Sequence, residues 1–493
     1  MPRRRNALSQ CQLFDDRYSM NTSRADVIVI GAGPAGVLAA LRCADLGAKT
    51  SLLARDAFGG MAANDGPVPV RVLAQAARLM REARQLERYG ISASEPVLNY
   101  TTLLARVQDV VGEVRGRSLL RQNIDSLGVT VYEKTGAARF VDAHTLEIES
   151  GIRLQADKFI LCTGGVSRRL PIPGFEFTST HSDAWALTSV PSSMLVVGAG
   201  ATGAQVASIF HAFGSHVQLF EAGPRILATE DDDVAAAVAA AFRSSGMEVR
   251  ENFGTIESFE KTPSGVRMNY AKDGQKNSAE AALAIVAVGW AADTTGLNLA
   301  AAGVELEHRK FVKVDEYLRT SAPHIFAAGD VTGRLMLAPE AIQDGFIAGT
   351  NAVQGPCMPL SSRVSPAGSF TDPEYASVGP TEKKAREEHE VVVATAHFDS
   401  TTRTIIDGRT FGFCKLIVDR KTAKILACHV VGDRAVDIVQ AAAIAVAAGM
   451  RVDELAQVAL SFPTYAGILI RVASLAAKQL NLKLNWQAYQ VTA

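Results

Sequence analysis

Residues 25–54 read ADVIVIGAGPAGVLAALRCADLGAKTSLLA: an apolar β-branched run, glycines at Gly31, Gly33 and Gly36, a segment with helical spacing, and a second apolar run. This order is typical of a β-strand, a helix and a second parallel strand. The glycines of G-x-G-x-x-G permit a tight turn and a close approach of the backbone to a pyrophosphate, while the helix N-terminus offers N–H groups to the anion. The stretch therefore predicts a Rossmann-like unit that binds a dinucleotide.

The pattern recurs at residues 192–221, SSMLVVGAGATGAQVASIFHAFGSHVQLFE. Its glycines are Gly198, Gly200 and Gly203, and Glu221 follows the first of them by 23 residues. A carboxylate at this place accepts hydrogen bonds from the adenosine ribose hydroxyls and repels a 2′-phosphate. NAD(H) is therefore favoured over NADP(H) at the second unit.

Two residues qualify these interpretations. Arg225, four residues after Glu221, could serve a phosphate, although a solvated surface arginine is the other reading. In the first unit Ala54 stands where the ribose carboxylate is expected, so Asp56 or a backbone group would have to replace it.

Two further strands end in polar or glycine-rich turns. FILCTGG at residues 159–165 is a buried strand entering such a turn, and TSAPHIFAAGD at residues 320–330 ends on Asp330. An aspartate at the carboxyl end of a strand in an open α/β sheet points into the ligand crevice. Asp330 alone could equally cap a turn, but together with the upstream glycines it is predicted to contact a cofactor.

Composition narrows the class of protein. The 493 residues fit several domains, and 50 Lys and Arg against 51 Asp and Glu give a net charge of -1, so no global field attracts nucleic acid or an anionic membrane. The cysteines lie far apart in the chain without metal-ligand or C-x-x-C spacing, which favours a reducing compartment and buried thiols. They are Cys11, Cys43, Cys162, Cys357, Cys414 and Cys428.

No segment has the pattern of a secretion signal or a membrane span. Residues 1–24 contain arginines but no apolar core, and Met20 is an alternative start. Residues 439–450, VQAAAIAVAAGM, are too few to cross a bilayer and suit a packed helix. We expect a cytoplasmic protein that acts on small molecules, without nucleic-acid or membrane partners and without a metal.

These elements, in this order, resemble the flavin-dependent pyridine nucleotide-disulfide oxidoreductases, the family of glutathione reductase, dihydrolipoamide dehydrogenase and mercuric reductase. The resemblance begins near Ala25 and continues through residues 289–306, where Trp290 replaces the usual arginine, and residues 337–349. It ends with residues 369–382 and 412–435, which are similar to the family's dimerisation domain.

The resemblance implies an α/β protein with two Rossmann-like dinucleotide-binding domains, for FAD and NAD, and a C-terminal α+β dimerisation domain. It also implies an obligate homodimer in which one subunit's C-terminal segment completes the other's active site. The expected organisation is an N-terminal extension (1–24), a split FAD domain (25–180 and 306–360), an NAD domain (181–305) and the dimerisation domain (361–493). The implied FAD residues are Gly31, Gly33, Gly36, Thr163, Gly164 and Asp330, and those for NAD(H) are Gly198, Gly200, Gly203 and Glu221.

The residues expected to carry disulfide chemistry are absent. The family's loop G-G-x-C-x-x-x-x-C-x-P corresponds to residues 59–69, where Ala62 and Pro67 replace the two cysteines. The family's H-P-T-x-x-E appears as FPTYAG, with Phe462 for the histidine and Gly467 for the glutamate that orients it. Neither thiolate attack nor thiol proton transfer is then available at these positions.

Three further positions differ near the expected nicotinamide side. The family's glutamate after the NAD glycines is Gln205, its partner lysine aligns with Arg71, and the aromatic gate is Ala201. Because the losses concentrate on one mechanism while the glycine motifs remain, we infer that nucleotide binding is retained and disulfide reduction is deleted.

The leading hypothesis is a diaphorase or quinone reductase. Hydride would pass from NADH to FAD, and electrons would then pass directly to a small acceptor such as a quinone or dye. Ala62, Pro67 and the partner subunit's Phe462 would line an apolar acceptor slot, unless the phenyl ring packs into the slot and closes it. The alternatives are an NADH oxidase that releases peroxide, and a catalytically silent FAD- and NAD-binding redox sensor or structural protein.

Overall fold

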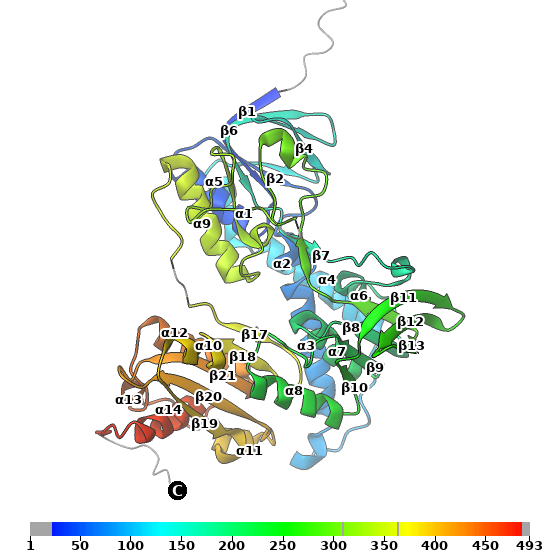
Figure 1. The fold of residues 1–493 in the computed structure, drawn as a ribbon, viewed down its shortest axis with the longest axis vertical. Coiled ribbons are helices and arrows are strands. Elements are labelled where there is room, and N and C mark those ends of the chain that lie inside the picture. Colours follow the sequence, from blue (N-terminus) through cyan, green and yellow to red (C-terminus); the bar gives the residue numbers. More distant parts are fainter. Residues whose placement is uncertain (1–21, 308–309, 362–363, 486–493) are drawn as a thin grey trace, which may run out of the picture. The chain divides into compact units, whose positions relative to one another are not determined.

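The computed structural model describes residues 22–485 except 308–309 and 362–363 (Figure 1). The expected N-terminal extension therefore lies outside the described residues except for residues 22–24, and Cys11 lies outside them as well. The chain forms two compact units. Among the described residues, the first contains 22–60, 118–165 and 292–360, and the second contains 61–117, 166–291 and 361–485. Residues 61–117 thus belong to the same compact unit as the second Rossmann-like domain. The domain boundaries expected from the sequence stay a prediction.

The first unit is built on a sheet with the strand order β3-β2-β1-β6-β5-β4, in which β16 also pairs with β6. Strands β3, β2, β1, β6 and β16 are mutually parallel along this order, as in a doubly wound dinucleotide fold. Helices α1 and α9 pack closely on each other. The elements are β1 (Thr22–Ile30), α1 (Pro34–Asp45), β2 (Thr50–Ala54), α5 (Leu119–Ser126), β3 (Thr130–Glu133), β4 (Ala138–Asp142), β5 (Thr145–Ile148), β6 (Arg153–Leu161), β16 (Ile325–Ala327) and α9 (Ala338–Gln354).

A second parallel sheet, of order β10-β9-β8-β14, forms the other Rossmann-like domain. An antiparallel sheet β11-β12-β13 and a small sheet of β7 and β15 accompany it. The elements are β7 (Gly165–Ser167), α6 (His181–Trp185), β8 (Ser193–Val197), α7 (Ala201–Ala212), β9 (His216–Glu221), α8 (Asp232–Ser244), β10 (Glu248–Glu251), β11 (Thr255–Thr262), β12 (Gly265–Lys272), β13 (Gln275–Ala281), β14 (Leu283–Val286) and β15 (Trp290–Ala292).

The C-terminal domain has a five-stranded antiparallel sheet of order β17-β18-β21-β20-β19. Helices α12 and α14 pack against its strands, and α12 accounts for the Ala-rich segment that the sequence assigned to a packed helix. The elements are β17 (Ala367–Ser369), β18 (Tyr375–Val378), α10 (Glu382–Glu388), β19 (Val391–His397), α11 (Thr402–Ile406), β20 (Gly412–Asp419), β21 (Ile425–Gly432), α12 (Ala435–Ala447), α13 (Val452–Leu455) and α14 (Gly467–Gln479).

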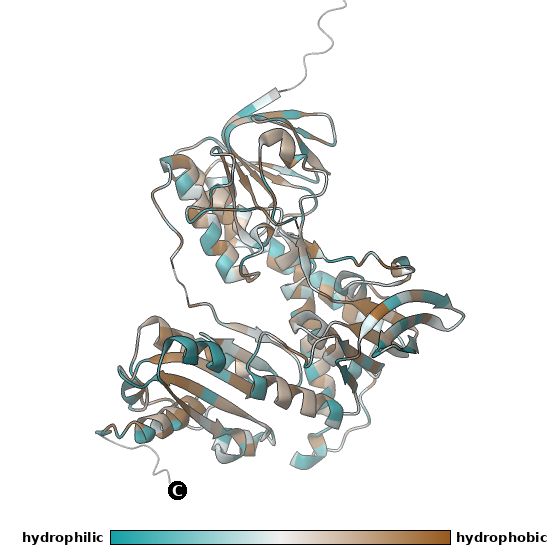
Figure 2. Ribbon diagram, viewed as in Figure 1, coloured by the Kyte–Doolittle hydropathy of each residue, from teal (hydrophilic) through white to brown (hydrophobic). Residues whose placement is uncertain are grey.

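The second unit is held together by one large hydrophobic core. Helices α3 (Pro67–Ala83) and α4 (Tyr100–Gly116) contribute to it, α7 and α8 add their buried faces, and Tyr375, Phe413 and Val431 of the C-terminal sheet complete it. Hydrophobic stretches of the strands appear brown in Figure 2. Because burying apolar surface is the dominant stabilising term, this shared core joins α3 to both neighbouring domains of the unit.

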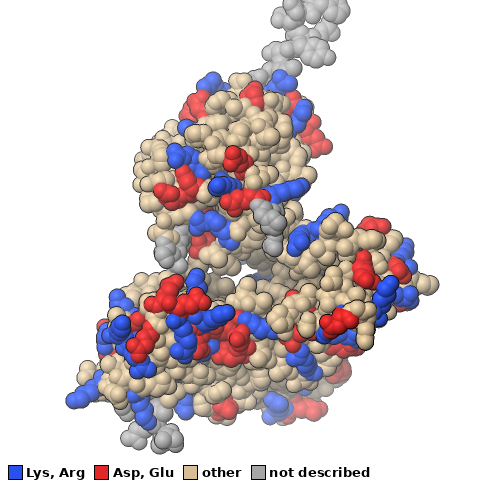
Figure 3. Space-filling model, in the orientation of Figure 1, with Lys and Arg blue, Asp and Glu red and all other residues tan. Residues whose placement is uncertain are grey.

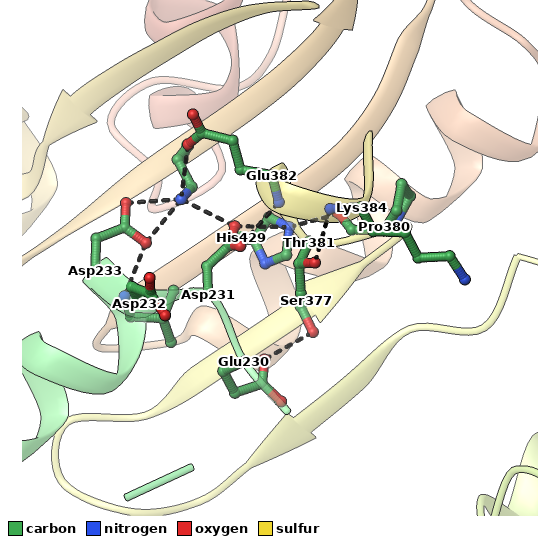
Figure 4. Close-up of polar contacts among 12 residues, drawn as sticks. Glu230, Asp231, Asp232, Asp233, Ser377, Pro380, Thr381, Glu382, Lys384 and His429 are labelled. Carbon is green, nitrogen blue, oxygen red and sulfur yellow. Dashed lines mark hydrogen bonds and ion pairs between the residues drawn. The ribbon is translucent and has the colours of Figure 1, made fainter. Parts of the chain in front are cut away.

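Lys415 is the centre of a buried cluster of ion pairs within the same unit. Its ammonium lies 2.9 Å from an oxygen of Asp231 and 2.7 Å from Asp233, at the start of α8. Both aspartates are labelled in Figure 4. His429 lies beside Asp231, 3.4 Å away, and donates from Nε2 to the Pro380 carbonyl oxygen at 3.0 Å. The cluster connects β20 and β21 to the second Rossmann-like domain.

One face of the molecule is mixed in charge. Basic and acidic side chains are interspersed over the face in Figure 3. Within the described residues, no helix is both long and apolar enough to cross a membrane.

Candidate active site

The carboxyl ends of three neighbouring parallel strands gather the first group of predicted site residues. Gly31 follows β1, Thr163 and Gly164 follow β6, and Asp330 follows β16. Since β6 pairs in parallel with both β1 and β16, the three turns lie at one edge of the sheet. The structure thus brings together residues that are up to 299 positions apart in the chain.

The geometry of this edge fits a bound dinucleotide. A Cβ atom at Gly36 would collide with the carbonyl oxygen of Gly31, so the loop and helix α1 approach each other closely only with glycine. The Thr163 hydroxyl is buried and has no hydrogen-bond partner within the described structure, which leaves it available to a ligand. Partial burial raises the pKa of Asp330 above its usual value, because desolvation disfavours the charged form.

The end of β2 differs from the expected ribose site. Ala54 is buried, and its carbonyl oxygen accepts from the backbone N–H of Thr135. Asp56, the alternative ribose contact, has a side chain that is 78% exposed and pairs with Arg55 at 3.0 Å. The role of either residue toward a ribose stays a prediction.

The second group lies at the edge of the β8-β9 pair. Both carboxylate oxygens of Glu221 accept backbone N–H groups, from Ala199 at 2.9 Å and from Gly223 at 2.8 Å. The carboxylate is therefore held against the glycine loop that contains Gly198, Gly200 and Gly203.

Arg225 is occupied locally. Its guanidinium donates to the carbonyl oxygens of Leu227 and Glu230, each at 2.7 Å, and pairs with Asp232 at 3.0 Å. These contacts hold its guanidinium within its own loop.

The loop that was compared with a disulfide loop forms two helices. Ala62 lies in α2 (Gly60–Asn64), and Pro67 is the first residue of α3. Proline suits this position because the first N–H of a helix has no partner to lose. Phe462 lies between α13 and α14 and is 68% exposed, an unusual state for a large aromatic side chain.

Arg71 and Gln205, which the sequence paired by resemblance, meet in the structure. The Arg71 guanidinium donates to Gln205 Oε1 at 2.9 Å and stacks 3.6 Å above the ring of Phe370. The same Gln205 oxygen accepts the backbone N–H of Phe370 at 3.1 Å. Burial lowers the pKa of Arg71 to about 10. Arg71 is thus half-buried and engaged, and Ala201 begins α7 in an exposed position.

None of the cysteines that the structure describes lies within residues 59–69. Cys43, Cys162, Cys414 and Cys428 are buried and Cys357 is exposed. Burial raises the pKa of Cys43 to about 12, with Arg42 opposing it, and burial also raises that of Cys162. Although the cysteines are scattered in the sequence, Cys414 and Cys428 approach to 3.8 Å between sulfurs because β20 and β21 are adjacent.

A group of polar side chains around the buried His181 was not predicted from the sequence. This imidazole lies between Ser167 and Ser182, with Asp65 beyond the second serine. Asp65 lies between Ala62 and Pro67 in the sequence, so a carboxylate within an altered loop was the one available signal.

Two descriptions of known protein families match most of the chain. The family description "pyridine nucleotide-disulphide oxidoreductase" matches residues 25–345, and its dimerisation domain matches residues 365–471. The chain belongs to the pyridine nucleotide-disulphide oxidoreductase family. Members are flavoenzymes that use FAD and NAD(P)H, and the dimerisation domain supports a homodimer. The two Rossmann-like domains and the dimerisation domain expected from the sequence are confirmed.

Relatives in this family cover most of the chain. A mercuric reductase of Bacillus cereus is 31% identical over 444 residues, 90% of this chain and 70% of the relative. A dihydrolipoyl dehydrogenase of Geobacillus stearothermophilus is 31% identical over 460 residues, 92% of this chain and 96% of the relative. The HOCl-induced flavoprotein disulfide reductase RclA from Escherichia coli has a TM-score of 0.80 at 24% identity, covering 91% of this chain and 99% of its own, and shares the fold.

Proposed function

We propose that this family member passes electrons from NADH through FAD directly to a small acceptor such as a quinone or dye, without disulfide chemistry. The observation that carries the proposal is the absence of a thiol at Ala62 and Pro67. A disulfide reductase needs a thiolate there, and neither alanine nor proline can form one.

Two buried thiols support the same interpretation. A buried thiol with a raised pKa is held protonated at neutral pH and is a poor nucleophile, which describes Cys43 and Cys162. The base position is equally altered, because Phe462 has no ionisable group.

The chain's own residues suit nucleotide binding and an apolar acceptor. Thr163 and Asp330 would hold FAD with the glycine loop of β1, and bound FAD would accept hydride and release electrons. Glu221 would hold the ribose of NADH, and the internal contacts of Arg225 support NADH over NADPH. Ala62, Pro67 and the partner subunit's Phe462 would line a slot for a flat, weakly polar acceptor.

An anaerobic titration of the purified yellow protein with NADH, followed by one addition of benzoquinone, tests this function. We expect the flavin absorbance to bleach and then recover, with steady turnover of benzoquinone and none of lipoamide or oxidised glutathione. Disulfide reduction at a rate comparable to that with quinone would contradict the proposal. Peroxide equal to the NADH consumed in air would favour the oxidase alternative, and no bleaching would favour the silent binder.

A further inference from the structure

His181 is at the centre of a continuous chain of hydrogen-bonding side chains. Its Nδ1 lies 3.1 Å from the Ser167 hydroxyl, and its Nε2 lies 3.4 Å from the Ser182 hydroxyl. The Ser182 hydroxyl in turn donates to an Asp65 carboxylate oxygen at 2.5 Å. We call this group the His181 relay; it consists of Ser167, His181, Ser182 and Asp65.

The contacts assign a direction to the hydrogens. Ser182 must donate to Asp65, because an ionised carboxylate only accepts. The Ser182 oxygen is then free to accept from Nε2–H of His181, which leaves Nδ1 to accept from Ser167. Every hydrogen in this arrangement points toward Asp65, so a shift along the chain delivers one proton at the carboxylate.

The relay runs between two partly exposed ends through a buried centre. The His181 side chain is 6% exposed, whereas that of Asp65 is 36% exposed. Trp290 packs edge-on against the imidazole with ring centroids 5.0 Å apart, and Trp185 lies edge-on at 6.4 Å. These indole rings cover the imidazole, whose polar neighbours are the two serines and, at 3.9 Å from Nε2, Asp65.

The charges around His181 suit a neutral imidazole at rest. Burial lowers its pKa from the usual value, while Asp65 and Asp183 oppose that shift. Asp183 is engaged in its own helix cap, where it accepts from the N–H and hydroxyl of Thr180 at 2.7 and 2.9 Å. A neutral imidazole has one donor and one acceptor nitrogen, which is what a relay requires.

Two departures from the family pattern meet at this histidine. Asp65 lies in the loop that lost its cysteines, and Trp290 replaces the arginine that is usual at its position. The contacts connect the imidazole to the loop in which the acceptor slot is proposed.

We propose that the His181 relay supplies the solvent proton that completes acceptor reduction, in place of the missing histidine and glutamate. This inference rests on the proposed function. Hydride from NADH carries two electrons and one proton, and a quinone needs two electrons and two protons to become a hydroquinone. The second proton leaves Asp65 for the acceptor oxygen, and an equivalent proton enters from water at Ser167.

Comparison of two acceptors separates proton delivery from electron transfer. Benzoquinone consumes a proton, whereas ferricyanide accepts electrons only. Loss of a positioned proton donor typically costs a factor of 100 or more. For H181Q and D65N we therefore expect the kcat with benzoquinone to fall about 100-fold, and the ferricyanide rate to change less than about twofold. H397Q, at an exposed histidine of β19, is the matched control and should change neither rate.

A second readout does not depend on turnover. Hydrogen–deuterium exchange at the imidazole Cε1, followed by mass spectrometry, reports the pKa of individual histidines. Because the Asp65 charge raises the pKa of His181, D65N should lower it further and S182A should leave it nearly unchanged. S182A should still slow benzoquinone reduction, and it replaces H181Q if that variant does not fold.

The outcomes distinguish the two proposals. Wild-type protein whose flavin is not reduced by NADH, or that reduces a disulfide as fast as benzoquinone, would refute the proposed function, and the relay with it. Wild-type protein that reduces ferricyanide but not benzoquinone would refute the relay alone. Wild-type protein that reduces both, with variants that reduce benzoquinone normally or lose both acceptors equally, would refute the relay alone.

Discussion

Replacement of Lys415 by methionine should lower the stability of the protein, because it removes the ion pairs between the second Rossmann-like domain and the dimerisation domain. The Lys415 side chain is only 3% exposed and is surrounded by Asp231, Asp233 and Glu382. Burial disfavours its charge, but hydrogen bonds to the two aspartates outweigh burial and raise its pKa. Methionine has a similar length and is apolar, so the main change is the loss of the cation.

The magnitude follows from the solvent access of the carboxylates that remain. Breaking a buried ion pair by removing one partner costs about 3–5 kcal/mol, because it leaves an uncompensated charge. Asp233 is 46% exposed and can regain water, whereas Asp231 is 6% exposed and cannot. We therefore expect a loss near the lower limit, about 3 kcal/mol, which corresponds to a fall in melting temperature of about 6 °C for a domain of this size.

Thermal unfolding of K415M and wild-type protein at pH 7.5 measures this effect. K421M, at an exposed lysine between β20 and β21, controls for the loss of a positive charge and should melt within about 1 °C of wild type. A K415M protein that melts with wild type, or a K421M protein that loses as much stability as K415M, would refute the reasoning.

Three further predictions concern other groups. Burial, reinforced by Asp433, raises the pKa of Glu374 to about 7, so the folded state holds an extra proton and loses stability as the pH rises from about 4.5 to 7. In urea unfolding, the free energy of unfolding of E374Q should therefore fall by up to about 3 kcal/mol less than that of wild type between pH 5 and pH 8. G36V should be purified without flavin absorbance near 450 nm, because its side chain collides with the phosphate-binding loop; normal flavin content would contradict the site. Q205L should lower the free energy of unfolding by about 3 kcal/mol in the same urea assay, because it leaves Arg71 and the backbone N–H of Phe370 without their acceptor. Q205E keeps an acceptor and should unfold at a higher urea concentration than Q205L.

Patterns local in the chain were enough to predict much of this protein. The glycine spacings at Gly31 and Gly198 imply both dinucleotide units, because a phosphate-binding turn depends on a few consecutive residues. The same holds for the altered loop, since Ala62 and Pro67 exclude a disulfide whatever the fold. The packing of residues 61–117 was less accessible, because they share a hydrophobic core with α7, α8 and the C-terminal sheet that no local pattern identifies.

Tertiary structure alone decided which distant side chains meet. Ser182 and Asp65 are 117 positions apart, and Lys415 and Asp233 are 182 apart, yet each pair lies within hydrogen-bonding distance. Even Cys414 and Cys428 meet only because two strands pair in one register. The sequence by itself determined which chemical groups the chain has and which local turns they can form. Their contacts depended on folding, because burial of apolar surface selects the arrangement of elements and polar partners are then paired within it.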